Sequence, residues 1–148
     1  MCEALVAPQM GAKGLQFGVR RCAPGWTARA DPEKVRQIIL NLLTNALKFT
    51  DRGGRVELEC RQGDDMLRIT VRDTGRGIPP GQRERIFEPF VQVDAGLTRT
   101  QSGVGLGLSI SRDLARGMGG DLTIDHAGDS GSAFTLSLPS WREAANQL

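Results

Sequence analysis

Residues 35–49 combine the apolar periodicity of a core helix with a line of polar side chains. At about 100° per residue, the apolar side chains share one broad face, as in an amphipathic helix that lies on a sheet. They are Val35, Ile38, Ile39, Leu42, Leu43, Ala46 and Phe49. Asn41, Asn45 and Lys48 follow one edge of that face. Two carboxamides and an ammonium in line could coordinate a metal ion and its phosphates, although a solvated helix edge has the same pattern.

The size and composition of the chain are those of an ordinary globular protein. Its 148 residues suffice for one domain with a hydrophobic core. The net charge of +2 is too small to indicate a nucleic-acid partner, and the few aromatic residues argue against a base-stacking surface. No apolar run reaches the roughly 18–20 residues of a membrane span, and no signal-peptide pattern opens the chain. We therefore expect this segment to contact neither nucleic acid nor membrane.

The cysteines and the single histidine form no metal-binding pattern. Cys2, Cys22 and Cys60 are odd in number and lack a C-x-x-C pair. Their spacing argues against a disulfide framework or a zinc site and favours the reducing cytoplasm. His126 has no Cys or His near it in the sequence. We interpret it as an ordinary residue at a strand end, not as a ligand or phosphate carrier.

Hydrophobic periodicity and turn residues predict a series of helices and strands. Helices are expected over residues 3–13, from Pro32 to the turn at 51–54, and over residues 82–87 and 105–118. Strands are expected over residues 15–20, 55–62, 66–73, 122–126 and 133–138. Asp31 should cap the long helix, and Pro139 should end the last strand. Alternating apolar and charged residues in the second and third strands predict a hairpin with one solvated face.

A carboxylate and two glycines follow this hairpin, in the string Asp73-Thr74-Gly75-Arg76-Gly77. A carboxylate at a strand end, in a partly apolar pocket, can accept a hydrogen bond from an exocyclic amine such as that of adenine. Glycines let the backbone approach a flat ring without a Cβ clash. The string is a weak signal by itself, because a pair of turn glycines has the same form.

A second glycine run, Gly103-Val104-Gly105-Leu106-Gly107-Leu108, leads into the predicted helix 105–118. Backbone N–H groups and the helix dipole at such a helix start favour phosphate. The run is not a Walker loop, because no G-K-[ST] occurs, and it is not a dinucleotide G-x-G-x-x-G after a strand. Residues 92–103 lack periodicity and are rich in small polar residues, which predicts a mobile loop. A flexible loop without a ligand is the alternative for this run.

Four strings occur in a fixed order: Asn-x-x-x-Asn-x-x-Lys-Phe, Asp-x-Gly-x-Gly, Gly-x-Gly-x-Gly-Leu and Gly-Ser-x-Phe. They resemble the N, G1, G2 and G3 boxes of the histidine kinase catalytic domain, and Ile-Phe-Glu-Pro-Phe at 86–90 resembles its F box. The resemblance covers about residues 3–139. It implies the Bergerat ATP-binding fold, an α+β two-layer sandwich in which three helices back a mixed sheet of about five strands. Residues 1–148 would form this single domain, with a lid at about 92–104 and a tail over 140–148.

The resemblance also implies the residues that bind ATP. Asp73 would bind the adenine amine, with support from Ser132. Asn45 would be the protein ligand of Mg²⁺, and Asn41 and Lys48 would contact phosphates. The glycines of the second run would wrap the β- and γ-phosphates. The complete implied set is Asn41, Asn45, Lys48, Phe49, Asp73, Gly75, Gly77, Ile78, Phe90, Gly103, Val104, Gly105, Leu106, Gly107 and Ser132. Phe87 and Phe90 would pack the base of the lid, or both would simply be core residues.

The implied function is that of the ATP-binding catalytic domain of a two-component sensor histidine kinase. Asn41 stands where related gyrase, chaperone and mismatch-repair ATPases place a water-activating Glu. An amide is no base at neutral pH, so intrinsic ATP hydrolysis should be weak. The phosphoacceptor histidine should lie on a separate helical dimerisation domain absent from this chain, because His126 cannot replace it. The chain alone should bind Mg-ATP without labelling itself.

Two alternatives stay open for the function. One is a self-sufficient ATPase of the same superfamily, which Asn41 and the Lys-Phe-Thr after the N box argue against. The other is a nucleotide-binding regulatory module without phosphotransfer. The intact boxes argue against it, although Val104 replaces the more usual small or hydroxyl residue in the lid. The resemblance implies two partners, the helical dimerisation domain of the same kinase and the receiver domain of a response regulator. It also implies a cytoplasmic location and a monomeric fragment.

Overall fold

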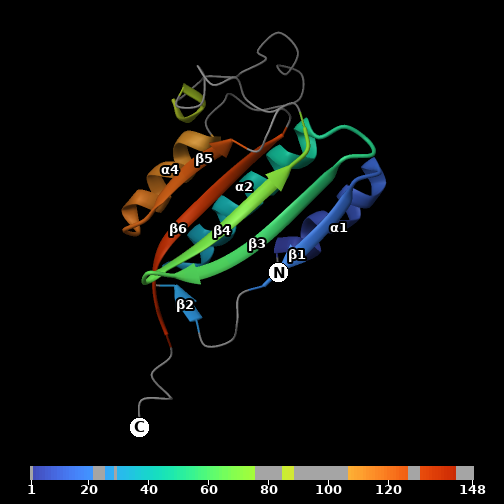
Figure 1. Cartoon of the computed structure of the whole chain (residues 1–148). Coiled ribbons are helices and arrows are strands. Elements are labelled where there is room, and N and C mark those ends of the chain that lie inside the picture. Colours follow the sequence, from blue (N-terminus) through green and yellow to red (C-terminus); the bar gives the residue numbers. More distant parts are fainter. Residues whose placement is uncertain are drawn as a thin grey trace.

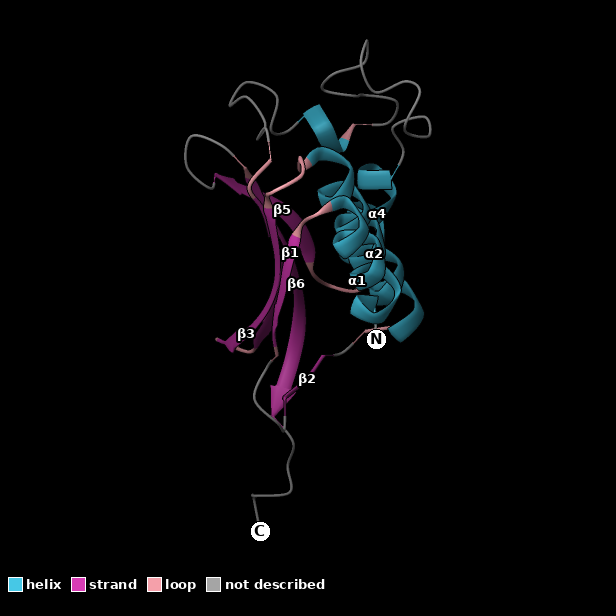
Figure 2. Cartoon of the chain, turned by 90° about the vertical axis from the view of Figure 1, so that its right-hand side faces the viewer, coloured by secondary structure: helices cyan, strands magenta, loops and turns pink. Residues whose placement is uncertain are grey.

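A computed structural model describes residues 2–21, 26–28, 30–75, 85–88, 107–126 and 131–142. They form two layers, a β-sheet and a set of helices that cover one of its faces (Figure 2). In this part of the chain the helices are α1 (Cys2–Lys13), α2 (Pro32–Phe49) and α4 (Gly107–Gly117). A short 3-10 helix, η2 (Arg85–Phe87), contacts α4. The predicted α+β two-layer fold is therefore confirmed.

The described strands form one mixed sheet (Figure 1). They are β1 (Gln16–Arg20), β2 (Trp26–Ala28), β3 (Arg55–Gly63), β4 (Met66–Asp73), β5 (Asp121–His126) and β6 (Ser132–Arg142). The order is β1-β3-β4-β6-β2, and β5 also pairs with β6. β1 is parallel to β3, while every other pair of neighbouring strands among the described residues is antiparallel. The sequence predicts all of these strands except the short β2.

Helix α2 begins where its sequence predicts and is tied down at its end. The Oδ1 of Asp31 accepts a hydrogen bond from the backbone N–H of Glu33 at 2.9 Å, and the proline between them occupies the first turn. At the other end, the Nζ of Lys13 donates to the backbone oxygens of Leu47 at 2.7 Å and Lys48 at 3.2 Å. A cation at a helix C-terminus satisfies free carbonyls and complements the helix dipole. Helix α1 therefore anchors the end of α2.

The predicted apolar face of α2 packs against the sheet. Its fully or nearly fully buried side chains are Ile38, Leu42, Leu43 and Ala46. They belong to one core with inward side chains of the strands, among them Val56, Val71, Leu122, Leu136 and Leu138. Burying such a side chain contributes about 1.5–3 kcal/mol. This packing fixes the rotation of α2 about its axis, so the polar edge of the helix lies beside α4, which α2 contacts.

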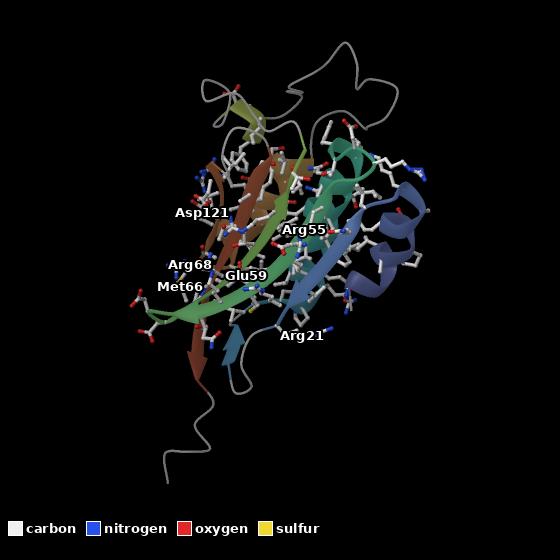
Figure 3. All side chains as sticks on the ribbon, turned by 45° about the vertical axis from the view of Figure 1, so that its right-hand side comes forward. Arg21, Arg55, Glu59, Met66, Arg68 and Asp121 are labelled. Carbon is white, nitrogen blue, oxygen red and sulfur yellow. The ribbon has the colours of Figure 1, made fainter. Side chains whose placement is uncertain are left out.

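The hairpin of β3 and β4 has the predicted solvated face. Figure 3 labels Arg55 and Glu59 on β3 and Arg68 on β4, all members of the alternating charged set. Asp64 and Asp65 form the turn with φ angles of 54° and 60°. Two successive residues with positive φ give the turn whose twist matches that of the paired strands.

Strand β6 continues past Pro139 to Arg142. The prediction that Pro139 ends the last strand is therefore wrong. Ser140, the next residue, donates its backbone N–H to the backbone oxygen of Asp65 next to β4. Successive N–H groups of a strand point to opposite edges, so the nitrogen of Pro139 points toward β5. On that edge the pairing with β5 reaches only as far as Ser137, and the pairing with β2 begins at Ser140. The missing N–H is therefore not needed at this position of the ladder.

Cys60, on β3, is disulfide-bonded, which corrects the expectation drawn from the number and spacing of the cysteines. The predicted helix 105–118 is described as α4 from Gly107 onward, and of the predicted helix 82–87 only η2 belongs to the described residues. The predicted mobile loop at 92–103 lies outside them. None of the helices in the described segments is long and apolar enough to cross a membrane.

Candidate functional site

Asp73 is the last residue of β4 and is held from two sides. The hydroxyl of Ser132, its partner in the register between β4 and β6, donates to Asp73 Oδ2 at 2.9 Å. The backbone N–H of Gly75 donates to Asp73 Oδ1 at 2.9 Å. Burial raises the pKa of the Asp73 carboxyl above its ordinary value, and the hydrogen bonds from Gly75 and Ser132 oppose this rise. The predicted support of Asp73 by Ser132 is thus present in the fold.

Ser132→Ala should raise the pKa of Asp73 further. The change removes a hydrogen bond to the carboxylate and leaves the burial that favours the protonated form, so the charged form loses stabilisation. Carbon-13 NMR titration of the Asp73 carboxyl measures both proteins, with the ordinary Asp value of about 3.9 as the reference. The direction of the change is the test. A pKa of Asp73 in Ser132→Ala that is equal to or below its value in the parent contradicts this role for the Ser132 hydroxyl.

Two glycines bring neighbouring backbone segments against the Asp73 strand end. A Cβ on Gly75 would lie 2.3 Å from the backbone oxygen of Phe49, at the end of α2. A Cβ on Gly131 would lie 2.2 Å from the backbone oxygen of Asp73, and Gly131 has a φ of +94° that L side chains rarely adopt. Only glycine fits at these two positions. The end of α2, the end of β4 and the turn before β6 therefore meet around one carboxylate.

The polar edge of α2 faces the start of α4. The Nδ2 of Asn41 donates to the hydroxyl of Ser111 on α4 at 3.1 Å. A Cβ on Gly107, the first residue of α4, would lie 2.6 Å from Asn41 Oδ1. Further along α2, the Nζ of Lys48 lies 5.9 Å from the ring centroid of Phe49. Burial lowers the pKa of the Lys48 ammonium.

The described site residues form a line along α2 rather than one cluster. Asn41 meets Gly107 at one end of the line, and Phe49 meets Gly75 beside Asp73 at the other. At 1.5 Å per residue these two ends lie about 12 Å apart along the helix axis. The ends of α2 and β4 and the start of α4 lie toward the same end of the molecule (Figure 1). Such a line suits an elongated ligand with a hydrogen-bonding head and a polar tail.

Eight of the predicted ATP-binding residues belong to the described part of the chain, and seven do not. Those outside it are Gly77, Ile78, Phe90, Gly103, Val104, Gly105 and Leu106. Phe87 is buried in the core, where its ring lies edge-on to that of Phe134 with centroids 6.3 Å apart. The guanidinium of Arg112 lies 4.2 Å from the Phe87 ring centroid. Phe87 therefore has the core position that its alternative interpretation predicts.

Sequence reasoning missed Ser111, and it placed Gly131 in the string that resembles the G3 box without giving it a role in the site. Ser111 lies one helical turn after Gly107, so the spacing of Ser111 from the glycine run was visible in the sequence. Its partner, Asn41, is 70 residues away along the chain. No pattern in a single sequence marks a contact over that separation.

A family model of histidine kinase-, DNA gyrase B- and HSP90-like ATPases matches residues 30–142. The chain is 39% identical over 139 residues to an uncharacterised sensor-like histidine kinase of Rhizobium meliloti, covering 94% of the chain and 26% of the relative. It is 48% identical over 109 residues to the sensor histidine kinase RcsC of Escherichia coli, covering 74% of the chain and 11% of that protein. The chain thus spans a minor part of each of these curated relatives.

Solved structures of histidine kinases have the same fold. Full-length ShkA in complex with AMPPNP superposes with a TM-score of 0.83 at 36% identity, covering 97% of this chain and 29% of ShkA. The mycobacterial sensor histidine kinase MprB superposes with a TM-score of 0.80 at 29% identity, covering 95% of this chain and 94% of the solved chain. The family model covers well over half of the chain and includes α2, β4 and β6, the elements that carry Asn41, Asp73 and Ser132. The chain belongs to the family of histidine kinase-, DNA gyrase B- and HSP90-like ATPases.

Proposed function

We propose that this chain is the ATP-binding catalytic domain of a two-component sensor histidine kinase. It presents the γ-phosphate of Mg-ATP to a phosphoacceptor histidine on a separate helical dimerisation domain. The observation that carries the proposal is the partly buried Asp73, held by Gly75 and Ser132, at one end of the polar line on α2. The sensor histidine kinases among its relatives and the AMPPNP complex of ShkA support the same assignment.

The adenine end of the site fits a purine amine. The Asp73 carboxylate accepts hydrogen bonds from the Gly75 N–H on Oδ1 and from the Ser132 hydroxyl on Oδ2. Each carboxylate oxygen can accept more than one hydrogen bond, so the group can also accept an N–H from a ligand. The contacts around Gly75 and Gly131 leave no room for side chains at those positions. These two glycines let the end of α2 and the turn before β6 pack against the strand end that carries the carboxylate. Gly77 and Ile78 are assigned to the same end by the resemblance alone.

The phosphate end of the site lies along α2 toward α4. Asn41 and Lys48 supply N–H donors and a positive charge, which suit phosphate oxygens. Asn45, between them on the same helix edge, would hold Mg²⁺, a hard cation that accepts an amide oxygen and keeps water and phosphate oxygens as its other ligands. The bound cation would neutralise charge on the phosphates. Gly103, Val104, Gly105, Leu106 and Gly107 complete this end in the proposal, and Phe49 and Phe90 flank the nucleotide.

The proposed reaction is transfer to histidine rather than rapid hydrolysis. Asn41 already donates to Ser111 and has no basic lone pair with which to take a proton from water. General-base activation of water, which a dedicated ATPase needs, therefore has no residue at this position. In the proposal the chain holds the nucleotide, and hydrolysis of its γ-phosphate stays slow until the acceptor histidine arrives.

The proposal extends to the surroundings of the domain. Its partners are the helical dimerisation domain that bears the acceptor histidine and the receiver domain of a response regulator. The domain itself comprises residues 1–148, with a core at about 3–139 and a lid at about 92–104, and it acts in the cytoplasm. A monomer is expected for the isolated chain.

Calorimetric titration with Mg-ATP and with its nonhydrolysable analogue tests the nucleotide site. The chain should bind both, and Asn45→Asp should weaken both by about tenfold or more, because a carboxylate next to the phosphates repels them. Gln62→Glu is the matched control, since it makes the same amide-to-acid change away from the site. Gln62 lies on β3 opposite Leu67, at the other end of the β3–β4 pairing from Asp73. Its affinity should equal that of the parent.

Mixing the chain with a separately produced helical domain of a sensor kinase tests the transfer step. Radiolabelled γ-phosphate should appear as acid-labile label on the acceptor histidine, while ATP hydrolysis without the acceptor stays slow. Acid-labile label on His126, or hydrolysis at the rate of a dedicated ATPase, contradicts the proposal.

A further inference from the structure

We propose that Ser111, on α4, is a positioning residue that sets the orientation of the Asn41 carboxamide on α2. The inference rests on the proposed function, in which Asn41 contacts the phosphates of ATP. Ser111 itself contacts no phosphate in this proposal. It acts through Asn41 and decides which atom of the carboxamide faces the nucleotide.

The contact between the two side chains is specific and shielded from water. Ser111 is 2% exposed, so its hydroxyl is cut off from solvent. Asn41 Nδ2 lies 3.1 Å from Ser111 Oγ, which satisfies that hydroxyl. Ser111 lies one turn after Gly107, and both residues meet the same carboxamide. The N-terminal turns of α4 thus contact Asn41 at two points.

The orientation matters because the two ends of a carboxamide have opposite hydrogen-bonding roles. Its NH₂ group can donate to a phosphate oxygen, while its carbonyl oxygen repels one. With one N–H given to Ser111, the second N–H of Asn41 stays available for a phosphate. A side chain free to rotate would present the oxygen part of the time.

The start of α4 favours the same orientation. Both polar atoms of the Asn41 carboxamide lie close to the position of a Cβ on Gly107, the first residue of the helix, Oδ1 at 2.6 Å and Nδ2 at 3.0 Å. The first N–H groups of a helix have no partner within it, and the helix dipole is positive there. The positive potential of a helix start favours the carbonyl oxygen over the NH₂ group at this place. Ser111 and the helix start together hold Oδ1 at α4 and leave an N–H for the ligand.

A double-mutant cycle with Ser111→Ala and Asn41→Ala tests the inference. Ser111→Ala should weaken Mg-ATP binding about three- to tenfold, the effect of losing one hydrogen bond. It should leave the binding of adenosine, which has no phosphate, unchanged. In the Asn41→Ala background, Ser111→Ala should have no further effect, because its only route to the phosphates is gone. Ser140→Ala is the matched control, since it removes another buried hydroxyl, on β6, and should change neither affinity.

The side-chain NMR signals of Asn41 give an independent readout. The NH₂ resonances that disappear in Asn41→Ala should shift in Ser111→Ala, while those of Asn45 stay in place. Parent-like Mg-ATP affinity in Ser111→Ala, or an equal loss of adenosine binding, overturns the inference. The inference is also overturned if Ser111→Ala weakens Mg-ATP binding as much in the Asn41→Ala background as it does in the parent. Failure of the parent chain to bind Mg-ATP would instead contradict the proposed function.

Discussion

Asp73→Asn should weaken Mg-ATP binding by about 5- to 100-fold. Asp73 accepts hydrogen bonds from the Gly75 N–H and the Ser132 hydroxyl, one on each oxygen. An amide in its place turns an NH₂ group toward one of these donors and presents one acceptor fewer to the adenine amine. A partly buried polar group left without its partner costs about 1–3 kcal/mol, which corresponds to that range of affinity. Titration calorimetry of the purified variant with Mg-ATP measures the loss.

The matched control for this change is Asp125→Asn, which makes the same substitution on β5. Asp125 is exposed, and it accepts a hydrogen bond from Thr135 at 3.3 Å, away from Gly75. Its affinity for Mg-ATP should be that of the parent. Titration with Mg-GTP completes the test, because selectivity for adenine over guanine is the role proposed for Asp73. If Asp73→Asn binds ATP and GTP as tightly as the parent binds ATP, the assignment of Asp73 to the adenine amine is wrong.

Gly131→Ala should lower both the free energy of unfolding and the affinity for Mg-ATP. A residue with a side chain at a φ of +94° costs about 1–2 kcal/mol. The added Cβ would also lie 2.2 Å from the backbone oxygen of Asp73, and such overpacking costs about 1–3 kcal/mol more. Relief of this contact must move the end of β4 or the turn before β6. Either shift separates Asp73 from Ser132, so we expect at least about a tenfold loss of affinity.

Gly53→Ala separates the backbone contribution from the steric one. Gly53 has a φ of +90°, close to that of Gly131, but a Cβ there would meet no atom within 4 Å. This variant should lose only the conformational part, about 1–2 kcal/mol, and should bind Mg-ATP like the parent. Urea unfolding and calorimetry of both variants give the comparison. Equal losses of stability in the two variants would show that the contact with Asp73 carries no energetic weight.

Local patterns predicted most of the elements because the causes of those elements are local. The cap of Asp31, the proline after it and the apolar periodicity of residues 35–49 place α2 with its observed start and buried face. Alternation places β3 and β4, and the turn at Asp64 and Asp65 joins them. The prediction for Pro139 was wrong, because the tolerance of a strand for proline depends on which neighbour faces the missing N–H. That neighbour is set by sheet topology, which local sequence does not contain.

The sequence by itself determined the type of each site residue and its place on a helix edge, a strand end or a helix start. It therefore specified a carboxylate, two carboxamides and an ammonium at positions that suit a nucleotide. Tertiary structure alone decided how they are supported. The pairing of β4 with β6 brings Ser132 to Asp73, and the packing of α2 beside α4 brings Ser111 to Asn41. These partners are far apart in the chain, and only burial of the shared core brings them within hydrogen-bond distance.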